Sequence, residues 1–133
     1  MRFLLDTDIC IFAIRKRSAT LLKHLRAHRA SDVCVSSITV AELQYGVAKS
    51  ERQAANAEAL QLFLAPLAIL PFDDAAAVHY GSMRAKLESK GTPIGAMDLL
   101  IAAHAASLPA TVVTNNEAEF RRVPGIEVQN WSR

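Results

Sequence analysis

The sequence is poor in several residue types, and each shortage excludes a class of protein. Glycine and proline each occur only 5 times in 133 residues while hydrophobic residues make up 51%, which excludes collagen-like and disordered chains. The apolar runs fall short of the roughly 20 residues that a membrane-spanning helix needs. Asp6 and Asp8 interrupt the first run before it reaches the length of a signal peptide. We therefore expect one cytoplasmic domain, residues 1–133, with no membrane segment.

Cysteine is also scarce, and its two copies indicate no chemistry of their own. Cys10 and Cys34 lie in apolar surroundings and lack the spacing of a metal-binding pair. We expect both as buried free thiols in a reducing cytoplasm.

Acidic residues are absent between Arg15 and Arg29, a segment that holds 6 of the 15 Lys and Arg residues. The rest of the chain carries 9 basic and 13 acidic residues, so the net charge of +2 hides an asymmetry. Concentrated positive charge is typical of proteins with an anionic partner, nucleic acid being the common case. Lys23, Arg26 and Arg29 are then the candidate RNA-binding residues. A solvated helix face over a buried leucine stripe explains the segment equally well.

Short apolar runs alternate with helical patterns along the chain. The strand candidates are residues 2–6, 33–36, 67–70, 111–114 and 126–128. The helical patterns extend from the first strand to about residue 30, and then cover residues 39–50, 51–64, 73–90, 98–107 and 116–122. This alternation predicts an α/β fold with three layers, α/β/α, around a mostly parallel sheet of four to five strands. In such folds, ligands bind beyond the carboxyl ends of the strands.

Carboxylates and amides stand where the predicted strands end or the next helices begin. They are Asp6, Glu42, Asp98, Asn115, Asn116 and Glu119. Because parallel strands end at one edge of a sheet, we expect these side chains to converge there. Oxygen ligands without Cys or His suit a hard cation such as Mg²⁺ or Mn²⁺. Such an ion activates water and positions a phosphodiester for in-line attack.

Each of these residues also has a purely structural explanation. Capping-box spacing joins Thr39 to Glu42 and Asn116 to Glu119, and N-cap positions would suit Asp6, Asp8 and Asp98. However, Asp6 and Asp98 directly adjoin apolar segments, where an unpaired carboxylate is costly. Their joint occurrence therefore favours a site. The hydroxyls of Thr7 and Thr114 are candidates to orient the acids or a phosphate, and turn or cap roles are equal alternatives.

Four ordered motifs resemble those of a known family and together span nearly the whole chain. They are residues 4–8 (LLDTD), 37–46 (SITVAELQYG), 94–104 (IGAMDLLIAAH) and 113–120 (VTNNEAEF). The set is similar to that of PIN-domain ribonucleases and, more narrowly, of the VapC toxins of bacterial toxin–antitoxin pairs. A lone DxD motif would not be specific, whereas four motifs at compatible spacing are.

The resemblance implies a PIN-like fold in which Asp6, Glu42 and Asp98 form the metal-binding acidic core of an RNA-cleaving enzyme. Its cofactor would be Mg²⁺, with Mn²⁺ as a substitute. Many PIN domains have Asp in place of Asn116, and we expect Glu119 to supply the fourth catalytic acid instead. The resemblance further implies homodimers, and inhibition by a VapB-type antitoxin in a larger hetero-oligomer that binds operator DNA through the antitoxin. The motif around Asn116 also links the chain to cleavage of initiator tRNA.

Two other interpretations use the same residues. A phosphatase of the haloacid dehalogenase type matches the spacing of Asp6 and Asp8, but no lysine stands suitably before the later pair, residues 73–74. Glu42 and Asp98 would also be left without roles. A receiver-like signalling domain, which is not an enzyme, needs a lysine at a late strand end where this chain has Thr-Asn-Asn. A PIN fold kept only for binding would not need all three core acids. We therefore expect an endoribonuclease.

Overall fold

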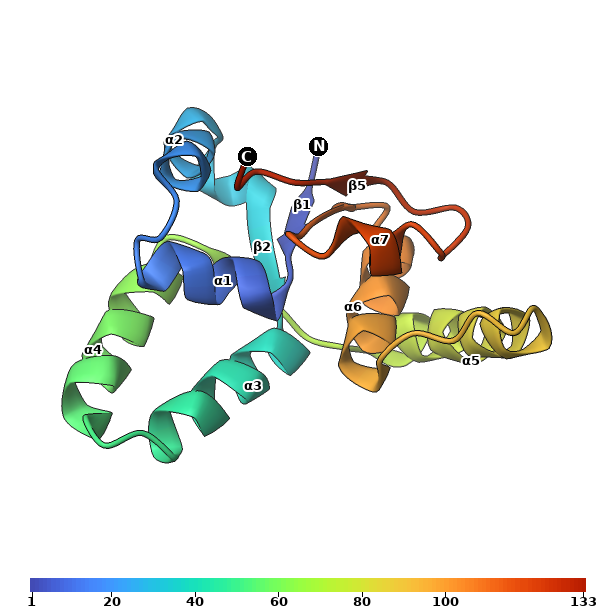
Figure 1. The fold of residues 1–133 in the computed structure, drawn as a ribbon, viewed down its shortest axis with the longest axis horizontal. Coiled ribbons are helices and arrows are strands. Elements are labelled where there is room, and N and C mark those ends of the chain that lie inside the picture. The colour runs from blue at the N-terminus through green and yellow to red at the C-terminus, as the bar shows by residue number, and fades with distance from the viewer.

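A five-stranded sheet forms the middle layer of the computed structural model, which describes residues 1–133 (Figure 1). Its strands are β1 (Phe3–Leu5), β2 (Val33–Ser36), β3 (Ala68–Leu70), β4 (Thr111–Val113) and β5 (Val128–Gln129). They lie in the order β3-β2-β1-β4-β5, and every neighbouring pair is parallel. The predicted α/β fold and its parallel sheet are thus confirmed. All the strands end at one edge of the sheet, which we call the carboxyl edge.

Helices connect the strands and cover the sheet on both faces. They are α1 (Thr7–Ile14), α2 (Ala19–Ala27), the short 3₁₀ helix η1 (Ala30–Asp32), α3 (Ser37–Ala48), α4 (Gln53–Leu64), α5 (Asp74–Ser89), α6 (Ala96–Ser107) and α7 (Glu117–Phe120). None of them combines the length and the apolar character that crossing a bilayer requires.

Alternation along the strands divides the core into two halves, one on each face of the sheet. Leu4 packs with the buried residues of α5 and α6, while Phe3 and Leu5 pack with those of α1 to α4. Successive side chains of a strand point to opposite faces, so each half takes every second residue. The two cysteines are divided in the same way, and both are buried and free as predicted.

The helical patterns predicted from the first strand to about residue 30 form two helices with a break between them. Helix α1 ends at Ile14, and Lys16 takes a positive φ of 54°. Helix α2 then starts afresh, with the Ser18 hydroxyl accepting a hydrogen bond from the amide of Leu21. The Lys and Arg residues at this break are good helix formers, so local propensity did not reveal it.

Candidate active site

Asp6 lies directly after β1 at the carboxyl edge, and its carboxylate is buried, with 2% of the residue exposed. One oxygen accepts a hydrogen bond from the Ile9 amide at 2.8 Å, so Asp6 is also the N-cap of α1. The other oxygen accepts one from the Thr114 hydroxyl at 2.5 Å. Burial nevertheless raises the pKa of Asp6 to about 6, and the negative charges of Asp8 and Glu42 add to that rise.

Glu42 faces Asp6 from helix α3, and a hydroxyl holds it in place. The Thr7 hydroxyl lies 2.6 Å from one Glu42 carboxylate oxygen and donates to it. The capping-box explanation for Thr39 and Glu42 is wrong, because α3 begins earlier than expected. Its N-cap is Ser36, whose hydroxyl accepts from the Ile38 amide at 3.1 Å.

Asp98 lies in the first turn of α6, where the N-cap is Gly95. Asp98 is therefore not the cap of its helix, and its carboxylate is half-buried near other acids. Burial and, next, the charge of Glu119 raise the pKa of Asp98 to about 7, with smaller contributions from Asp6 and Asp8. The structure thus brings Asp98 into electrostatic contact with the acids of β1 and α7.

Asn116 and Glu119 are joined by a hydrogen bond between their side chains. The Asn116 amide group donates to Glu119 at 2.7 Å and approaches Asp98 at 3.4 Å, so it lies between the two acids. The Gly95 amide also donates to Glu119, at 2.5 Å, and these two hydrogen bonds lower the pKa of Glu119. The capping box expected for Asn116 is absent, because its side chain caps no amide of α7.

The supporting residues predicted from the sequence divide into two groups. Thr7 and Thr114 contact Glu42 and Asp6, respectively, and the Thr114 hydroxyl also accepts from the backbone amide of Asn116 at 2.8 Å. Asn115 is half-buried beside them but makes no hydrogen bond to any of the acids.

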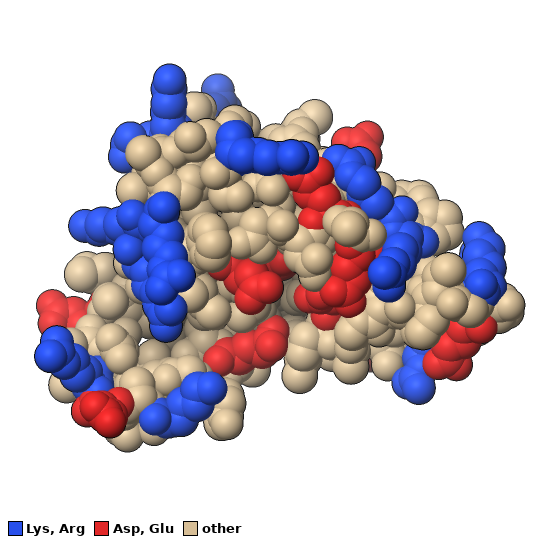
Figure 2. Space-filling model, viewed as in Figure 1, with Lys and Arg blue, Asp and Glu red and all other residues tan.

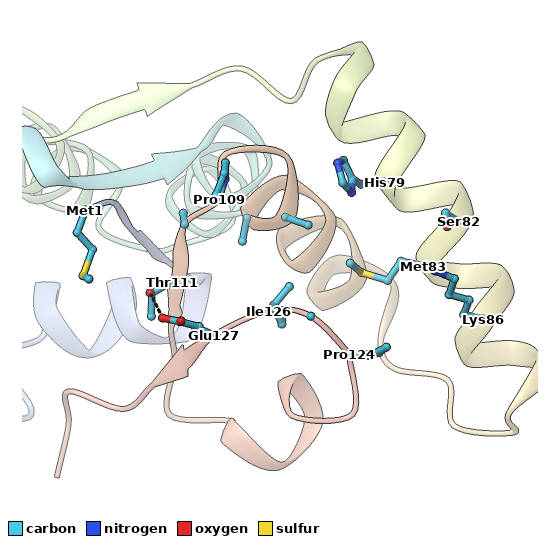
Figure 3. A pocket seen from close by; sticks show the side chains of 14 residues that line it. Met1, His79, Ser82, Met83, Lys86, Pro109, Thr111, Pro124, Ile126 and Glu127 are labelled. Atoms are coloured by element: carbon cyan, nitrogen blue, oxygen red, sulfur yellow. Dashed lines mark hydrogen bonds between the residues drawn. The ribbon is translucent and has the colours of Figure 1, made fainter.

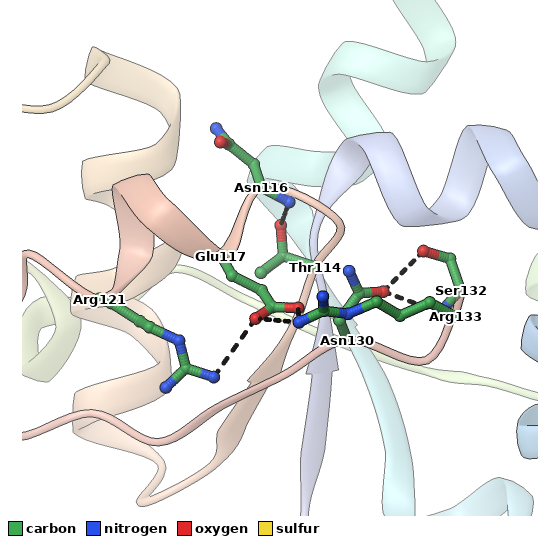
Figure 4. A network of polar contacts seen from close by, with 7 residues as sticks. All are labelled: Thr114, Asn116, Glu117, Arg121, Asn130, Ser132 and Arg133. Atoms are coloured by element: carbon green, nitrogen blue, oxygen red, sulfur yellow. Dashed lines mark hydrogen bonds and ion pairs between the residues drawn. The ribbon is translucent and has the colours of Figure 1, made fainter.

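Basic side chains form no ion pair with these carboxylates, although one acid nearby is fully paired. Glu117 lies 2.6 Å from Arg133 and 3.4 Å from Arg121, as Figure 4 shows, and Glu119 two residues later has no such partner. The only other ion pair in the chain joins Arg84 to Glu88. In Figure 2, acidic side chains gather at the centre of this face, and Lys and Arg side chains stand around them without covering them. We call Asp6, Glu42, Asp98 and Glu119 the acidic cluster.

The donor chemistry of the acidic cluster fits a divalent cation. Its groups are hard oxygen ligands, and mutual repulsion and burial raise the pKa of two of them, which a cation would relieve. As the side chains stand, no three carboxylate, imidazole or thiol groups lie close enough together to hold an ion. Hydrogen bonds from the Thr7, Thr114 and Asn116 side chains currently occupy several of the carboxylate oxygens.

Among the hollows on the surface, one is lined by a residue of the acidic cluster and another lies away from it. A groove of about 840 Å³ runs between α1, α3, α4 and the start of α6, and its lining includes Thr7, Asp8 and Glu42. A second cavity, of about 570 Å³, lies between α5, α6 and the segment before β5 (Figure 3). Glu127 is the only acid in its lining, where it accepts a hydrogen bond from Thr111 at 3.3 Å. The first groove is therefore the one that continues the site.

The predicted RNA-binding residues Lys23, Arg26 and Arg29 are exposed but do not join the acidic cluster. Lys23 and Arg26 lie on α2 and Arg29 follows its C-cap, and α1 lies between α2 and α3 in Figure 1. The end of α2 reaches the beginning of β1, where the His28 ring stands 4.7 Å from the Phe3 ring. Of the basic segment, Arg15 is the residue that lines the groove.

A buried contact that the sequence did not reveal links the helices that carry Glu42 and Asp98. His104 on α6 and Ser36 at the start of α3 lie 2.8 Å apart, and both are buried. Burial lowers the pKa of His104, so the neutral ring is favoured there. Nothing in the spacing of His104 pairs it with a serine 68 residues away, so the sequence did not identify this partner.

An α/β sheet with unpaired carboxylates at its carboxyl edge defines a class of proteins that bind a divalent cation for phosphate chemistry. Within that class, the PIN domain family matches residues 3–126. The chain is 42% identical to Ribonuclease VapC2 of Rickettsia felis, over 100% of both chains. It is also 42% identical to the tRNA(fMet)-specific endonuclease VapC of Salmonella typhimurium, over 98% of each.

A solved structure with the same fold supports the match. The crystal structure of VapBC2 from Rickettsia felis bound to a DNA fragment from their promoter superposes with a TM-score of 0.94 at 42% identity, covering 98% of this chain and 99% of that chain. The chain therefore belongs to the PIN domain family, and within it to the VapC ribonucleases.

The phosphatase and receiver interpretations are not favoured by these matches, and the structure explains the features that suggested the first of them. Asp73, part of the later acidic pair, caps α5 by accepting from the Ala76 amide at 3.1 Å. Ser36 caps α3 and contacts His104. Both residues thus have structural roles.

Proposed function

We propose that the chain is the toxic component of a toxin–antitoxin pair and cuts RNA as a Mg²⁺-dependent endoribonuclease. The observation that carries the proposal is the acidic cluster, in which four carboxylates, at the end of β1 and on α3, α6 and α7, lie near one another without an ion pair to Lys or Arg. Such repulsion is sustained in proteins where a cation completes the site. The ribonuclease names of relatives at 42% identity support the same reaction.

Asp6, Glu42 and Asp98 would hold the ion, and Glu119 would complete the site. Bound Mg²⁺ would polarise the scissile phosphate and help to generate the attacking hydroxide. The Thr114 hydroxyl fixes the orientation of Asp6, and the Thr7 hydroxyl fixes that of Glu42. Asn116 holds Glu119 beside Asp98 through its side-chain amide. Asn115 follows β4 in the same loop and is available to the substrate.

The proposal also includes a substrate and partners, which are inferred from the names of the relatives. A tRNA, initiator tRNA in particular, is the proposed target, since one relative at 42% identity is a tRNA(fMet)-specific endonuclease. A VapB-type antitoxin would inhibit the chain in the cytoplasm, because a neighbour of the same fold is a VapBC complex bound to promoter DNA. Each chain would form one domain, and two chains would form a homodimer. Operator DNA would be bound through the antitoxin. Lys23, Arg26 and Arg29 would contact the RNA away from the cut.

The test is cleavage by the purified chain, made without an antitoxin, with total bacterial RNA as substrate. Sequencing of the new RNA ends should map one or a few cut positions with MgCl₂ and none with EDTA. Glu119→Gln should lower the rate at least tenfold. Glu117→Gln is the matched control, because it lies on the same helix but is paired with Arg121 and Arg133. Absence of Mg²⁺-dependent cuts, or equal rates for the two variants, would contradict the proposal.

A further inference from the structure

Two consecutive arginines follow helix α7, and they differ in their partners. Arg121 donates to the Glu117 carboxylate at 3.4 Å, and Arg133 donates to the same carboxylate at 2.6 Å (Figure 4). The guanidinium of Arg122 instead donates to the backbone carbonyl of Pro93 at 3.3 Å, and it forms no ion pair with any carboxylate. Arg122 therefore keeps an unpaired positive charge on an exposed side chain.

Arg122 lies at the rim of the acidic cluster. Its backbone amide donates to the Glu119 carbonyl at 3.1 Å, and its side chain reaches the loop before α6. Gly95 in that loop donates its amide to the Glu119 carboxylate at 2.5 Å. This hydrogen bond is the main cause of the lowered pKa of Glu119, and the charge of Arg122 adds to it. In Figure 2, basic side chains over α7 and the segment after it stand directly beside the acidic side chains, without covering them.

An RNA substrate needs a cation at this rim. The carboxylates of the acidic cluster repel the anionic backbone, and one divalent ion would offset only part of their charge. A guanidinium binds phosphate through paired, charge-assisted hydrogen bonds. Arg122 uses one N–H on Pro93 and keeps the others free, and the bond to Pro93 reduces the side-chain freedom that is lost when a phosphate binds. The proposed function brings the scissile phosphate to the cluster, so a neighbouring phosphate of the same strand is the anion that Arg122 meets.

We propose that Arg122 binds the backbone phosphate of the RNA next to the scissile phosphate, through the N–H groups that Pro93 leaves free. The proposal rests on the proposed endoribonuclease function and adds to it a substrate-binding residue outside the acidic cluster. Because this contact is the same in the bound substrate and in the transition state, Arg122 lowers the KM and leaves kcat nearly unchanged. Every RNA carries backbone phosphates, so the contact positions the strand without reading its sequence.

The experiment compares Arg122→Gln with Arg121→Gln on a synthetic RNA that carries the cut position mapped with total RNA. Glutamine keeps a side-chain N–H donor but removes the charge. We expect Arg122→Gln to raise the KM about tenfold with little change in kcat. Arg121→Gln is the matched control and should raise the KM less than about twofold, since Arg121 is paired with Glu117. Arg122→Lys keeps the charge and should recover part of the loss.

Uncharged phosphates locate the contact. Versions of the RNA carry a methylphosphonate, on a 2′-O-methyl nucleotide, at the phosphate directly before or directly after the scissile one. One of the two should raise the KM of the wild type about tenfold but leave that of Arg122→Gln unchanged, because the charge that it contacts is already absent. Arg121→Gln should stay as sensitive as the wild type. The Mn²⁺ affinity of Arg122→Gln, measured by calorimetry without RNA, should not fall, because the variant removes positive charge beside the acids.

Each contrary result has a distinct meaning. If the wild type makes no Mg²⁺-dependent cut, the proposed function fails and the role of Arg122 fails with it. If the wild type cuts and Arg122→Gln keeps its KM, or if the losses from Arg122→Gln and from each uncharged phosphate multiply, Arg122 does not bind the backbone. If Arg122→Gln loses Mn²⁺ affinity, Arg122 holds the loop and Glu119 in place instead of a phosphate. If the variant weakens only the binding of a VapB-type antitoxin, Arg122 belongs to the protein interface and the proposal is overturned.

Discussion

The two ends of strand β1 are built on opposite principles. At its beginning, Phe3 joins an aromatic cluster with His24, His28 and Trp131, in which the His28 and Trp131 rings lie 4.5 Å apart and nearly parallel. The polar atoms there are satisfied: the Trp131 ring nitrogen donates to a glutamine side chain at 2.9 Å. At the other end, Asp6 enters a cluster of carboxylates that lacks any basic partner.

The contrast shows where the molecule gains stability and where it gives stability up. The aromatic cluster buries large rings and joins α2 to the C-terminal segment, while the acidic cluster keeps charges together that repel one another. Only two residues, Leu4 and Leu5, separate Phe3 from Asp6 along the strand. Unfavourable charge confined to one edge of a well-packed sheet is typical of a site that awaits a ligand.

The largest effect should come from removing a charge of the acidic cluster. Asp98→Asn keeps the shape of the side chain but weakens its hold on a cation, so we expect the cleavage rate to fall about a thousandfold. The variant should be at least as stable as the wild type at pH 8, because it removes repulsion. Asp74→Asn is the control, since Asp74 occupies the first turn of α5 as Asp98 does that of α6. Equal rates for both variants would remove Asp98 from the site.

At the aromatic cluster, a substitution should lower stability and leave the metal site unchanged. Trp131 is 2% exposed, so Trp131→Ala should lower the free energy of unfolding by about 3–5 kcal/mol in urea titrations. Trp131→Phe refills part of the cavity and should recover roughly half of that loss. The Mn²⁺ affinity of the folded Trp131→Phe variant should equal that of the wild type. A weakened affinity would show that the two ends of β1 are not independent.

The pH dependence of stability offers a finer comparison. In the folded chain the pKa values of Asp6 and Asp98 are raised from 3.8 to about 6 and about 7. The folded state therefore binds these protons more tightly than the unfolded state, and stability falls as the pH rises from about 4 through 7. Without divalent cations, the full shifts would lower the free energy of unfolding by roughly 4 kcal/mol between pH 5 and pH 8, and solvent screening of the half-exposed Asp98 reduces the expected loss to roughly 2–3 kcal/mol.

The lowered pKa of His104 has the opposite sign, because its stabilising effect is lost as the pH falls through about 6.5. The contribution of the two acids is therefore measured as the difference in the free energy of unfolding between the wild type and the Asp6→Asn/Asp98→Asn double variant. Urea titrations at each pH, with EDTA or MgCl₂, measure it. Mg²⁺ should abolish most of the difference, and a wild type that grows more stable than the double variant above pH 7 without Mg²⁺ would contradict the assignment.

The features that depend on residues adjacent in the sequence could be predicted from the sequence. Apolar runs that end in a carboxylate predicted β1 and the position of Asp6, and Asp98 was predicted from the apolar residues that follow it. The contacts between distant segments could not be predicted in this way. Gly95 donates to Glu119 across 24 residues, and Ser36 replaces Thr39 as the cap of α3 because the helix begins at the strand end.

The aromatic cluster escaped prediction for the same reason. His24 and His28 are four residues apart on α2, which is readable from the sequence, but Trp131 reaches them only through the path of the chain after β5. Only the structure identifies the partners of Trp131. The periodicity of apolar residues predicts which face of each helix is buried. Which element that face packs against depends on the order of the strands in the sheet.

The smallest effect should come from the basic residues on α2 and directly after it, which adjoin the aromatic cluster and lie outside the acidic one. Replacing Lys23, Arg26 and Arg29 together with glutamine removes three exposed charges, so RNA binding should weaken by a few fold. Its dependence on salt should flatten, because each phosphate contact contributes about 0.7 to the slope for single-stranded RNA. The Mn²⁺ affinity and kcat should stay as in the wild type, since none of the three residues forms an ion pair with the acidic cluster.

The control for this triple variant is Arg15→Gln/Lys49→Gln, which removes the cations of the groove. Filter-binding titrations of RNA at several KCl concentrations compare the two. Both variants should lower the slope, but only the groove variant should also raise the KM for an RNA that carries the mapped cut position, because Arg15 and Lys49 line the groove that also includes Glu42. An unchanged slope in the triple variant would remove α2 from the RNA site and leave the positive charge there as a solvated helix face. A loss of Mn²⁺ affinity in the same variant would instead show that the field of α2 reaches the acidic cluster, and the two ends of β1 would then be electrostatically coupled.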